Sequence, residues 1–252
     1  MIQLIQRFRG KMRRTLSHRL ARRDLAFQLA RPIVSFTFDD FPKNAATEGA
    51  RVLKDSGVSA TYYVSVGLLG TMAPTGRIAD REDLAPLLAA GHELGCHTFD
   101  HRHAWETDPR TFARAVDRNQ EEVRGIVAGC RFETMSYPIS QPRPANKRVA
   151  GQRFAGCRAG GQTCNVGVLD RNGLKAFFLE QARGRLEAVE AVIEENRRAN
   201  GWLIFATHDI DEHPTPYGCT SAFFRATVEC AVRSGAEILP VAAALRRIAG
   251  AT

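Results

Sequence analysis

The chain has 252 residues, of which 44% are hydrophobic and 25% charged, and this ordinary globular composition excludes a disordered or fibrous protein. No stretch reaches the roughly 18 consecutive apolar residues that would predict a membrane-spanning helix. The net charge of +8 lies in residues 1–31, which hold nine basic residues and one acid, so the rest of the chain is neutral overall. Any attraction to phosphate is therefore expected from this N-terminal segment.

Residues 1–31 are expected to form a basic helical arm of weak amphipathicity, because apolar and basic residues alternate along it. Such a helix can lie on an anionic membrane surface or on nucleic acid. We predict a weak membrane contact and no specific nucleic-acid binding. A plainer interpretation is a solvated helix that packs its apolar side on the main domain.

Two further features concern the compartment. The segment lacks the apolar stretch of about 7–15 residues that follows the basic start of a secretory signal. The six cysteines are scattered without a CxxC pair, which disfavours a zinc finger or a redox motif and predicts buried thiols in a reducing compartment. The sequence therefore favours a cytoplasmic protein, with the arm as its one means of peripheral contact with a membrane.

Residues 32–252 predict a single domain in which strands and helices alternate. The expected strands are 33–38, 60–66, 92–97, 134–137, 154–158, 202–207 and 236–239. The expected helices include 44–56, one between 80 and 91, 108–128, 184–199 and 221–234, with a short one before 154 and a last one at the C-terminus. This alternation indicates parallel strands with crossover helices, in a closed barrel or a doubly wound sheet. No glycine-rich nucleotide loop follows any of the strands.

Three polar clusters come directly after predicted strands. They are Asp39 with Asp40, His97 with His101, and His208 with Asp209. Taken singly, each is equally well explained as a turn, a helix cap or a surface loop. Because the carboxyl ends of parallel strands share one face, however, all three are expected to meet there.

The residue types in these clusters favour a metal-dependent hydrolase. An aspartate and two neutral imidazoles suit Zn²⁺ or another borderline divalent ion with open positions, and the i, i+4 spacing of His97 and His101 predicts that both rings lie on one side of a helical turn. The second aspartate can then take a proton from water, while a separate histidine protonates the leaving group. Non-haem iron oxygenases share the two-histidine, one-carboxylate set but need neither of these extra groups.

These motifs resemble those of the polysaccharide deacetylases (NodB-type, carbohydrate esterase family four). The matching segments, spread over about residues 32–245, are Thr37-Phe38-Asp39-Asp40, His97-Thr98-Phe99-Asp100-His101, Ser136-Tyr137-Pro138-Ile139-Ser140 and Phe205-Ala206-Thr207-His208-Asp209. The first two, in this order and at this separation, are the most specific. The resemblance implies a distorted (β/α)₇ barrel and the removal of acetyl groups from an N- or O-acetylated sugar or oligosaccharide.

The resemblance also implies a role for each matching residue. Asp39 corresponds to the general base and His208 to the general acid. The metal ligands correspond to Asp40, His97 and His101, with zinc as the first expectation and cobalt, nickel, manganese or iron as alternatives. Ile139 stands where the family has a tyrosine, whose backbone N–H helps to stabilise the oxyanion.

Two departures from the family pattern shape the remaining expectations. Ser136 replaces the arginine that pairs with the base, and we hypothesise that Arg158, at the end of the next strand, takes over this pairing. For the acid that orients the catalytic histidine there is no clear match, so Asp209 is the nearest substitute. Ser136 and Ile139 also predict a groove unlike that of enzymes acting on long chitin-like chains.

The candidate substrate contacts are Trp105, Tyr137 and His213. Trp105 can stack on a sugar face or close a loop over the core, and His213 lies in a proline-rich loop expected at the rim of the pocket. Two other functions stay open: a deacylase or amidohydrolase for a small non-sugar amide, and an inactive homologue that binds a glycan or a lipid.

Overall fold

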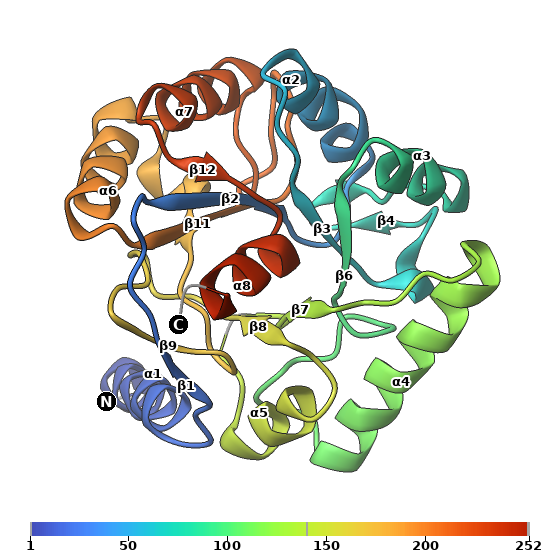
Figure 1. Ribbon diagram of the computed structural model, residues 1–252. Coiled ribbons are helices and arrows are strands. Elements are labelled where there is room, and N and C mark those ends of the chain that lie inside the picture. The colour runs from blue at the N-terminus through green and yellow to red at the C-terminus, as the bar shows by residue number, and fades with distance from the viewer. Residues whose placement is uncertain (1, 140, 251–252) are drawn as a thin grey trace.

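A parallel β-sheet curls around the core in the computed structural model, which describes residues 2–139 and 141–250 (Figure 1). Its strand order is β10-β11-β2-β3-β6-β7-β8, and β12 pairs with β2. The bounds are β2 Ile33–Phe38, β3 Thr61–Val64, β6 Glu93–Cys96, β7 Thr134–Ser136, β8 Gly156–Arg158, β10 Phe177–Phe178, β11 Trp202–Thr207 and β12 Glu237–Ile238. All seven expected strands belong to this sheet, so the predicted distorted barrel is confirmed; only the two-residue β10 was not foreseen.

The central strand, β2, is buried along its whole length. On one side it pairs with β11, from Ile33 opposite Trp202 to Phe38 opposite Thr207. Its other edge is shared, because β12 pairs with the start of β2 and β3 with its end. Parallel strands covered on both faces are usually apolar throughout, and the two polar residues of β2, Ser35 and Thr37, are buried together with the rest of the strand. The residues just after Phe38 are thereby held in a fixed place.

Eight α-helices surround or cover the sheet within the described ranges. They are α1 Ile2–Arg19, α2 Ala50–Asp55, α3 Leu84–Ala89, α4 Pro109–Ile126, α5 Pro144–Gly151, α6 Leu186–Ala199, α7 Ser221–Arg233 and α8 Val241–Ala249. Four shorter helical turns are η1 Ala45–Gly49, η2 Val66–Leu68, η3 Arg81–Asp83 and η4 Leu179–Ala182. The predicted start of α4 is confirmed, because Asp108 Oδ1 accepts hydrogen bonds from the N–H groups of Arg110 and Thr111.

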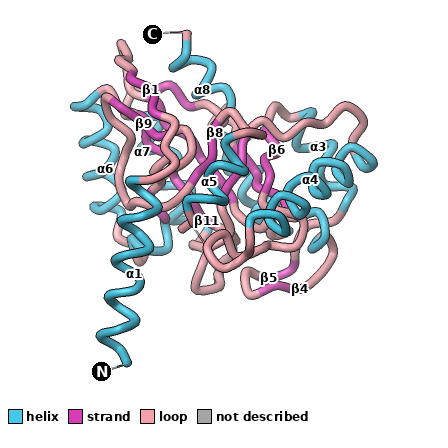
Figure 2. The backbone as a smooth tube through the Cα atoms, turned by 90° about the horizontal axis from the view of Figure 1, so that it is seen from below, coloured by secondary structure: helices cyan, strands magenta, loops and turns pink. Residues whose placement is uncertain are grey.

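The two ends of the barrel are covered differently. Helix α8 lies over the end where the strands begin: its first N–H groups donate to Thr61 Oγ1 (2.9 Å) and to the Glu93 carboxylate (2.8 Å). At the opposite end, α1 and the hairpin of β4 (Met72–Ala73) and β5 (Gly76–Arg77) extend beyond the barrel (Figure 2). The carboxyl ends of the strands point to this second end, where such folds keep their sites.

The N-terminal segment is helical over only part of its length. Helix α1 ends at Arg19, whereas the sequence predicted a helical arm to residue 31. Strand β1 (Asp24–Ala26) then pairs antiparallel with β9 (Val168–Asp170), and Phe27 and Leu29 are buried. In Figure 1, α1 lies in the ring of helices between α5 and α6. The end of this segment is thus part of the barrel body.

Two observations bear on the remaining expectations of the sequence. No helix in the described part of the chain is long and apolar enough to cross a membrane. All six cysteines are buried free thiols, as predicted.

Candidate active site

The chain changes direction sharply where β2 ends. Asp39 still follows the sheet, since its N–H donates to the carbonyl of Thr207 (2.9 Å). Asp40 and Phe41 then adopt left-handed conformations, with φ of 63° and 66°, which residues other than glycine rarely do and which concentrate at functional sites. As a result the two neighbouring carboxylates contact different partners.

Asp40 faces the two histidines of the second motif. Its Oδ1 lies 3.4 Å from His97 Nε2 and 3.2 Å from His101 Nε2, and the three possible ligand atoms all lie within 4.8 Å of one another. Oδ1 is buried and accepts no hydrogen bond within the described residues, whereas Oδ2 accepts one from Thr75 Oγ1 (3.0 Å). A buried oxygen without a donor, facing two ring nitrogens, fits the donor set of a divalent cation.

The rings of the two histidines are set for this role by their surroundings. His97 Nδ1 donates to the carbonyl of Ser136 (2.9 Å), which leaves Nε2 of a neutral ring free to act as a ligand. Burial lowers the pKa of His97, but the carboxylates of Asp40 and Asp39 outweigh burial and raise it. Burial, assisted by the charge of His97, lowers the pKa of His101 to about 4, which keeps its ring uncharged at neutral pH.

The predicted helical turn between the two histidines is wrong. Residues 97–101 form an irregular turn after β6, in which Thr98 and His101 adopt left-handed conformations with φ of 59° and 53°. The chain has to turn back across the strand ends to bring His101 beside Asp40, and a continuing helix would not do this.

Asp39 is held by a different pair of side chains. Ser136 Oγ donates to its Oδ1 (3.0 Å), and Arg158 Nη2 contacts both its Oδ2 and the Ser136 hydroxyl. The structure therefore shows the contact between Arg158 and Asp39 that the sequence hypothesis required. Burial would raise the pKa of Asp39, but the Arg158 guanidinium outweighs burial and lowers it.

Arg158 is itself fixed from both sides. It is 1% exposed, and its guanidinium lies 5.5 Å from the ring centroid of Tyr63 and 5.1 Å from that of Phe178. Aromatic faces attract a guanidinium, and its planar fork is suited to a buried carboxylate. The arginine that holds Asp39 thus comes from the end of β8, and Ser136 bridges the two.

His208 follows β11 and is oriented by the backbone. Its Nδ1 donates to the carbonyl of Tyr217 (3.0 Å), so Nε2 is left for the substrate. Asp209, the substitute expected from the sequence, does not hold His208: its carboxylate accepts from the N–H (2.7 Å) and hydroxyl (2.6 Å) of Thr215. The Asp209 carboxylate therefore stabilises the loop after β11. Gly218 packs so closely against Asp209 that a Cβ there would lie only 2.3 Å from it.

These groups line one cavity of about 840 Å³, within the range of about 300–1,000 Å³ typical of small-ligand sites. Six residues that the sequence predicted for the site line this cavity: Asp39, Asp40, His97, His101, Ile139 and His208. Ile139 has a φ of 60° and is 56% exposed, and its N–H donates no hydrogen bond within the described ranges. The sequence did not point to Thr75, Glu180, Tyr217, Arg14 and His18, which also line it.

Glu180 is the most unusual of these additional residues. It belongs to η4, and its Oε2 is buried without a hydrogen-bond partner in the part of the chain described. Burial, followed by the negative charge of Asp39, raises the pKa of Glu180 to about 7. No motif marked it, because its place beside the site depends on where β10 and the helical turn η4 directly after it lie in the fold.

The three predicted substrate contacts lie elsewhere. Tyr137 is buried, and its hydroxyl donates to the carbonyl of Asn172 (3.1 Å). Trp105 lies 5.4 Å from the Arg13 guanidinium, and His213 is exposed on its loop; neither lines the cavity. Ser140, the last residue of the third motif, falls outside the described residues.

The fold and site together define a parallel α/β barrel with the polar groups of a hydrolase at the carboxyl ends of its strands. Residues 28–159, just over half of the chain, match the family model described as polysaccharide deacetylase, and the chain belongs to this family. No curated protein matches the sequence. The predicted family is thereby confirmed, and with it the assignment to hydrolases that deacetylate carbohydrates.

Solved structures show the same fold at low sequence identity. The chitin deacetylase of the fungal pathogen Colletotrichum lindemuthianum has a TM-score of 0.63 and 16% identity, covering 86% of this chain and 89% of that one. A family 4 acetyl xylan esterase from Clostridium thermocellum, in complex with a cobalt ion, has a TM-score of 0.59 and 19% identity, covering 87% of this chain and 93% of that one. A carbohydrate esterase family 4 pseudoenzyme from Bacillus anthracis has a TM-score of 0.58 and 10% identity, covering 86% of this chain and 66% of that one.

Proposed function

We propose that this protein is a metal-dependent hydrolase that removes acetyl groups from an N- or O-acetylated carbohydrate. One observation carries the proposal: the buried, donor-free Oδ1 of Asp40 faces two histidine nitrogens, directly beside a second aspartate held by Arg158. This arrangement provides a cation site and a separate proton acceptor in one cavity.

Asp40 Oδ1 and the Nε2 atoms of His97 and His101 would hold the cation. A divalent ion bound there would polarise the acetyl carbonyl and make the attacking water more acidic. The donor set of one oxygen and two imidazole nitrogens favours zinc among such ions.

Asp39 accepts the proton of the attacking water. Its low pKa keeps the carboxylate ionised at neutral pH, and the contacts with Ser136 and Arg158 fix its orientation. Arg158 and Ser136 are therefore positioning residues that act through Asp39. The water oxygen forms the new bond to the acetyl carbon as Asp39 takes the proton.

His208 and Ile139 act on the other two parts of the substrate. Because His208 Nδ1 is held by the Tyr217 carbonyl, its Nε2 can carry the proton that the departing sugar nitrogen or oxygen needs. The N–H of Ile139 is available to stabilise negative charge on the carbonyl oxygen. The products are acetate and the free amine or alcohol of the sugar.

The inactive-homologue interpretation depended on the missing arginine of the third motif. Because Arg158 makes the corresponding contact with Asp39, that argument loses its basis. The small-amide alternative keeps the same catalytic groups and differs only in substrate, so the assay that tests the proposal also tests this alternative.

The test is acetate release from chitooligosaccharides, acetylated xylan and small acetamides by the purified protein, together with its metal content. We expect turnover of a carbohydrate that is lost on chelation and restored by Zn²⁺. Asp39→Asn should lower kcat by about 10²–10⁴-fold, the usual contribution of a positioned acid or base. Asp117→Asn, on the outer face of α4, is the matched control and should retain full activity.

Bound metal without turnover of any acetylated carbohydrate would contradict the proposal. Turnover of small acetamides alone would favour the amidohydrolase alternative.

A further inference from the structure

Helix α1 forms one wall of the catalytic cavity. Arg14 and His18, one helical turn apart, line the same cavity as Asp39, Asp40 and His208. The sequence predicted a basic arm for this segment, either in contact with a membrane or packed by its apolar side on the main domain, and did not predict a place at the site.

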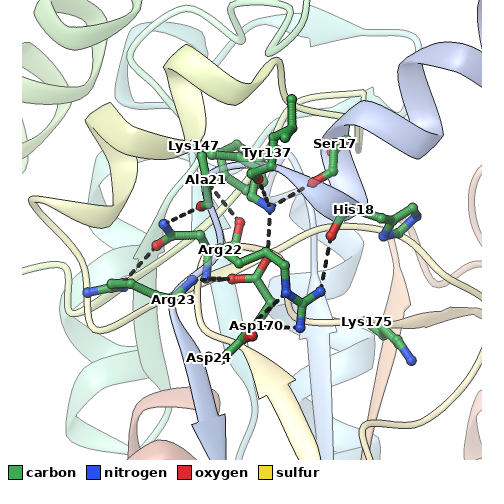
Figure 3. A network of polar contacts seen from close by, with 12 residues as sticks. Ser17, His18, Ala21, Arg22, Arg23, Asp24, Tyr137, Lys147, Asp170 and Lys175 are labelled. Carbon is green, nitrogen blue, oxygen red and sulfur yellow. Dashed lines mark hydrogen bonds and ion pairs between the residues drawn. The ribbon is translucent and has the colours of Figure 1, made fainter.

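The end of α1 is attached to the barrel by a buried lysine (Figure 3). Lys147, from α5, is 1% exposed, and its Nζ donates to the carbonyls of Ser17 (2.7 Å) and Leu20 (3.0 Å) and to Asp170 Oδ2 (2.7 Å). A positive charge at the carbonyl end of a helix is favourable, and here it also satisfies a buried carboxylate. The last turn of α1 is thus fixed in place.

Residues just after the helix add to this attachment. The N–H of Arg23 donates to Asp170 Oδ1 (2.9 Å), and the Arg23 side chain donates to Asn172 Oδ1 (2.8 Å) and to the carbonyl of Phe154 (2.8 Å). Asn172 in turn donates to the carbonyl of Ala21 (2.9 Å). These contacts hold the helix end at several points, so the placement of Arg14 and His18 at the cavity follows from buried interactions.

The basic residues near the end of α1 differ in how they are paired. Arg13 contacts Glu106 and Trp105, and Arg22 pairs with Asp24. Arg14, by contrast, makes no hydrogen bond or ion pair with any described residue. Its guanidinium is therefore available to a ligand in the cavity.

His18 and Lys11 complete this side of the helix. The His18 side chain is exposed at the cavity but partly covered by protein, and this partial burial, followed by the charges of Lys147 and Lys175, lowers its pKa and favours a neutral ring that donates a hydrogen bond. Lys11 is exposed and lies three residues before Arg14, which places it on the same side. Lys11 does not line the cavity, so the wall itself presents one full positive charge and a neutral donor.

We infer that Arg14 and His18 form a subsite for a phosphate group carried by the carbohydrate substrate. The inference rests on the proposed function and narrows it to acetylated sugars with a phosphate substituent, either free sugar phosphates or sugars linked through phosphate to a lipid. An arginine fork donates to two phosphate oxygens at once, the neighbouring His18 ring can donate to a third, and Lys11 adds a positive charge one turn earlier in the helix.

The test compares N-acetylglucosamine 1-phosphate with N-acetylglucosamine as substrates. The wild-type protein should prefer the phosphorylated sugar in kcat/KM by about tenfold, mainly through KM. Arg14→Gln should lower this preference about tenfold. Arg19→Gln removes the same charge from the same helix but does not line the cavity, so it should keep the wild-type preference, and the melting temperatures of both variants check that they fold.

The source of the phosphate is resolved by a third substrate, the same sugar phosphate esterified to a farnesyl chain in detergent micelles. A further gain over the soluble compound identifies a lipid-linked substrate, and no further gain identifies a free sugar phosphate; both depend on Arg14 and support the subsite.

Failure of the subsite and failure of the proposed function give different results. Turnover without a preference for phosphate, or an equal preference in Arg14→Gln and Arg19→Gln, overturns the subsite and leaves the deacetylase intact. Calorimetric binding of N-acetylglucosamine 1-phosphate that Arg14→Gln weakens, without acetate release by any variant, supports the subsite and contradicts the deacetylase.

Discussion

The two walls of the cavity are built in opposite ways. On the barrel wall, Asp39 and Arg158 are buried and satisfy each other, while Asp40 is set by Thr75 and the histidines. On the helix wall, Arg14 and His18 are exposed, and Arg14 has no partner within the described chain. Fixed, desolvated charges are suited to stabilising a reaction, whereas exposed donors are suited to selecting a ligand. Changes to the first wall should thus affect stability and kcat, and changes to the second should affect KM.

Arg158→Met should have the largest effect on stability, because it leaves the buried Asp39 carboxylate without its cation. We expect a loss of about 3–5 kcal/mol in the free energy of unfolding at pH 7, as when one partner of a buried ion pair is removed. Arg153→Met, which breaks the exposed pair with Asp117, is the matched control and should cost at most about 1 kcal/mol. Chemical denaturation of both variants measures the difference.

The same variant carries a pH signature. The folded-state pKa of Asp39 is depressed, so its pairing with Arg158 contributes stability that is present above the unfolded pKa of Asp39 and is lost as the pH falls through the folded one. The deficit of Arg158→Met should therefore be full at neutral pH and shrink in acid. An equal deficit at all pH values would show that lost packing, and not the lost charge pair, is responsible.

Lys147→Met tests whether the helix wall depends on its buried attachment. It leaves Asp170 Oδ2 and the carbonyls of Ser17 and Leu20 without the lysine donor, and we expect a loss of about 3 kcal/mol in unfolding free energy. Trypsin should also cut within α1 faster than in the wild-type protein. Lys54→Met, at an exposed position of α2, should change neither the unfolding free energy nor the rate of cleavage. If trypsin cleaves α1 of Lys147→Met at the wild-type rate, the helix wall is not fixed by this lysine.

Glu180→Gln should give the smallest effect. The pKa of Glu180 is raised to about 7 in the fold, so between about pH 4.5 and 7 the folded state holds a proton that the unfolded state has released. Stability should fall across this range by roughly 2–3 kcal/mol, and Glu180→Gln should remove that part of the slope. Denaturation of the metal-free protein at several pH values measures it, and an unchanged slope would contradict the assignment.

The barrel wall was largely predictable from the sequence because its chemistry begins where apolar strands stop. Phe38 and Thr207 end buried runs, and the next residues, Asp39 and His208, are polar side chains that the parallel topology brings to one face. Even the replacement of the family arginine by Arg158 could be anticipated, since Arg158 ends a neighbouring strand.

The helix wall could not be predicted in the same way. Amphipathicity shows that a helix has a packing side but not which surface receives it, and the contact that decides this joins Lys147 to Ser17 across the fold. Glu180 lies in the helical turn η4 and Tyr217 on a loop, and the positions of both depend on long-range packing. The left-handed residues Thr98 and His101 likewise follow from the tertiary need to turn back over the strand ends.

The buried Lys147 has a consequence for how the protein is made. Helix α1 is synthesised before the side chains that receive its end, because Lys147 and Asp170 come about 130–150 residues later. At translation rates of about 5–20 residues per second, the nascent helix waits about 7–30 s for its docking partners. During that interval the basic amphipathic helix is exposed to chaperones and to the ribosomal surface. The cavity wall that this helix forms is completed only after Lys147 and Asp170 have been synthesised.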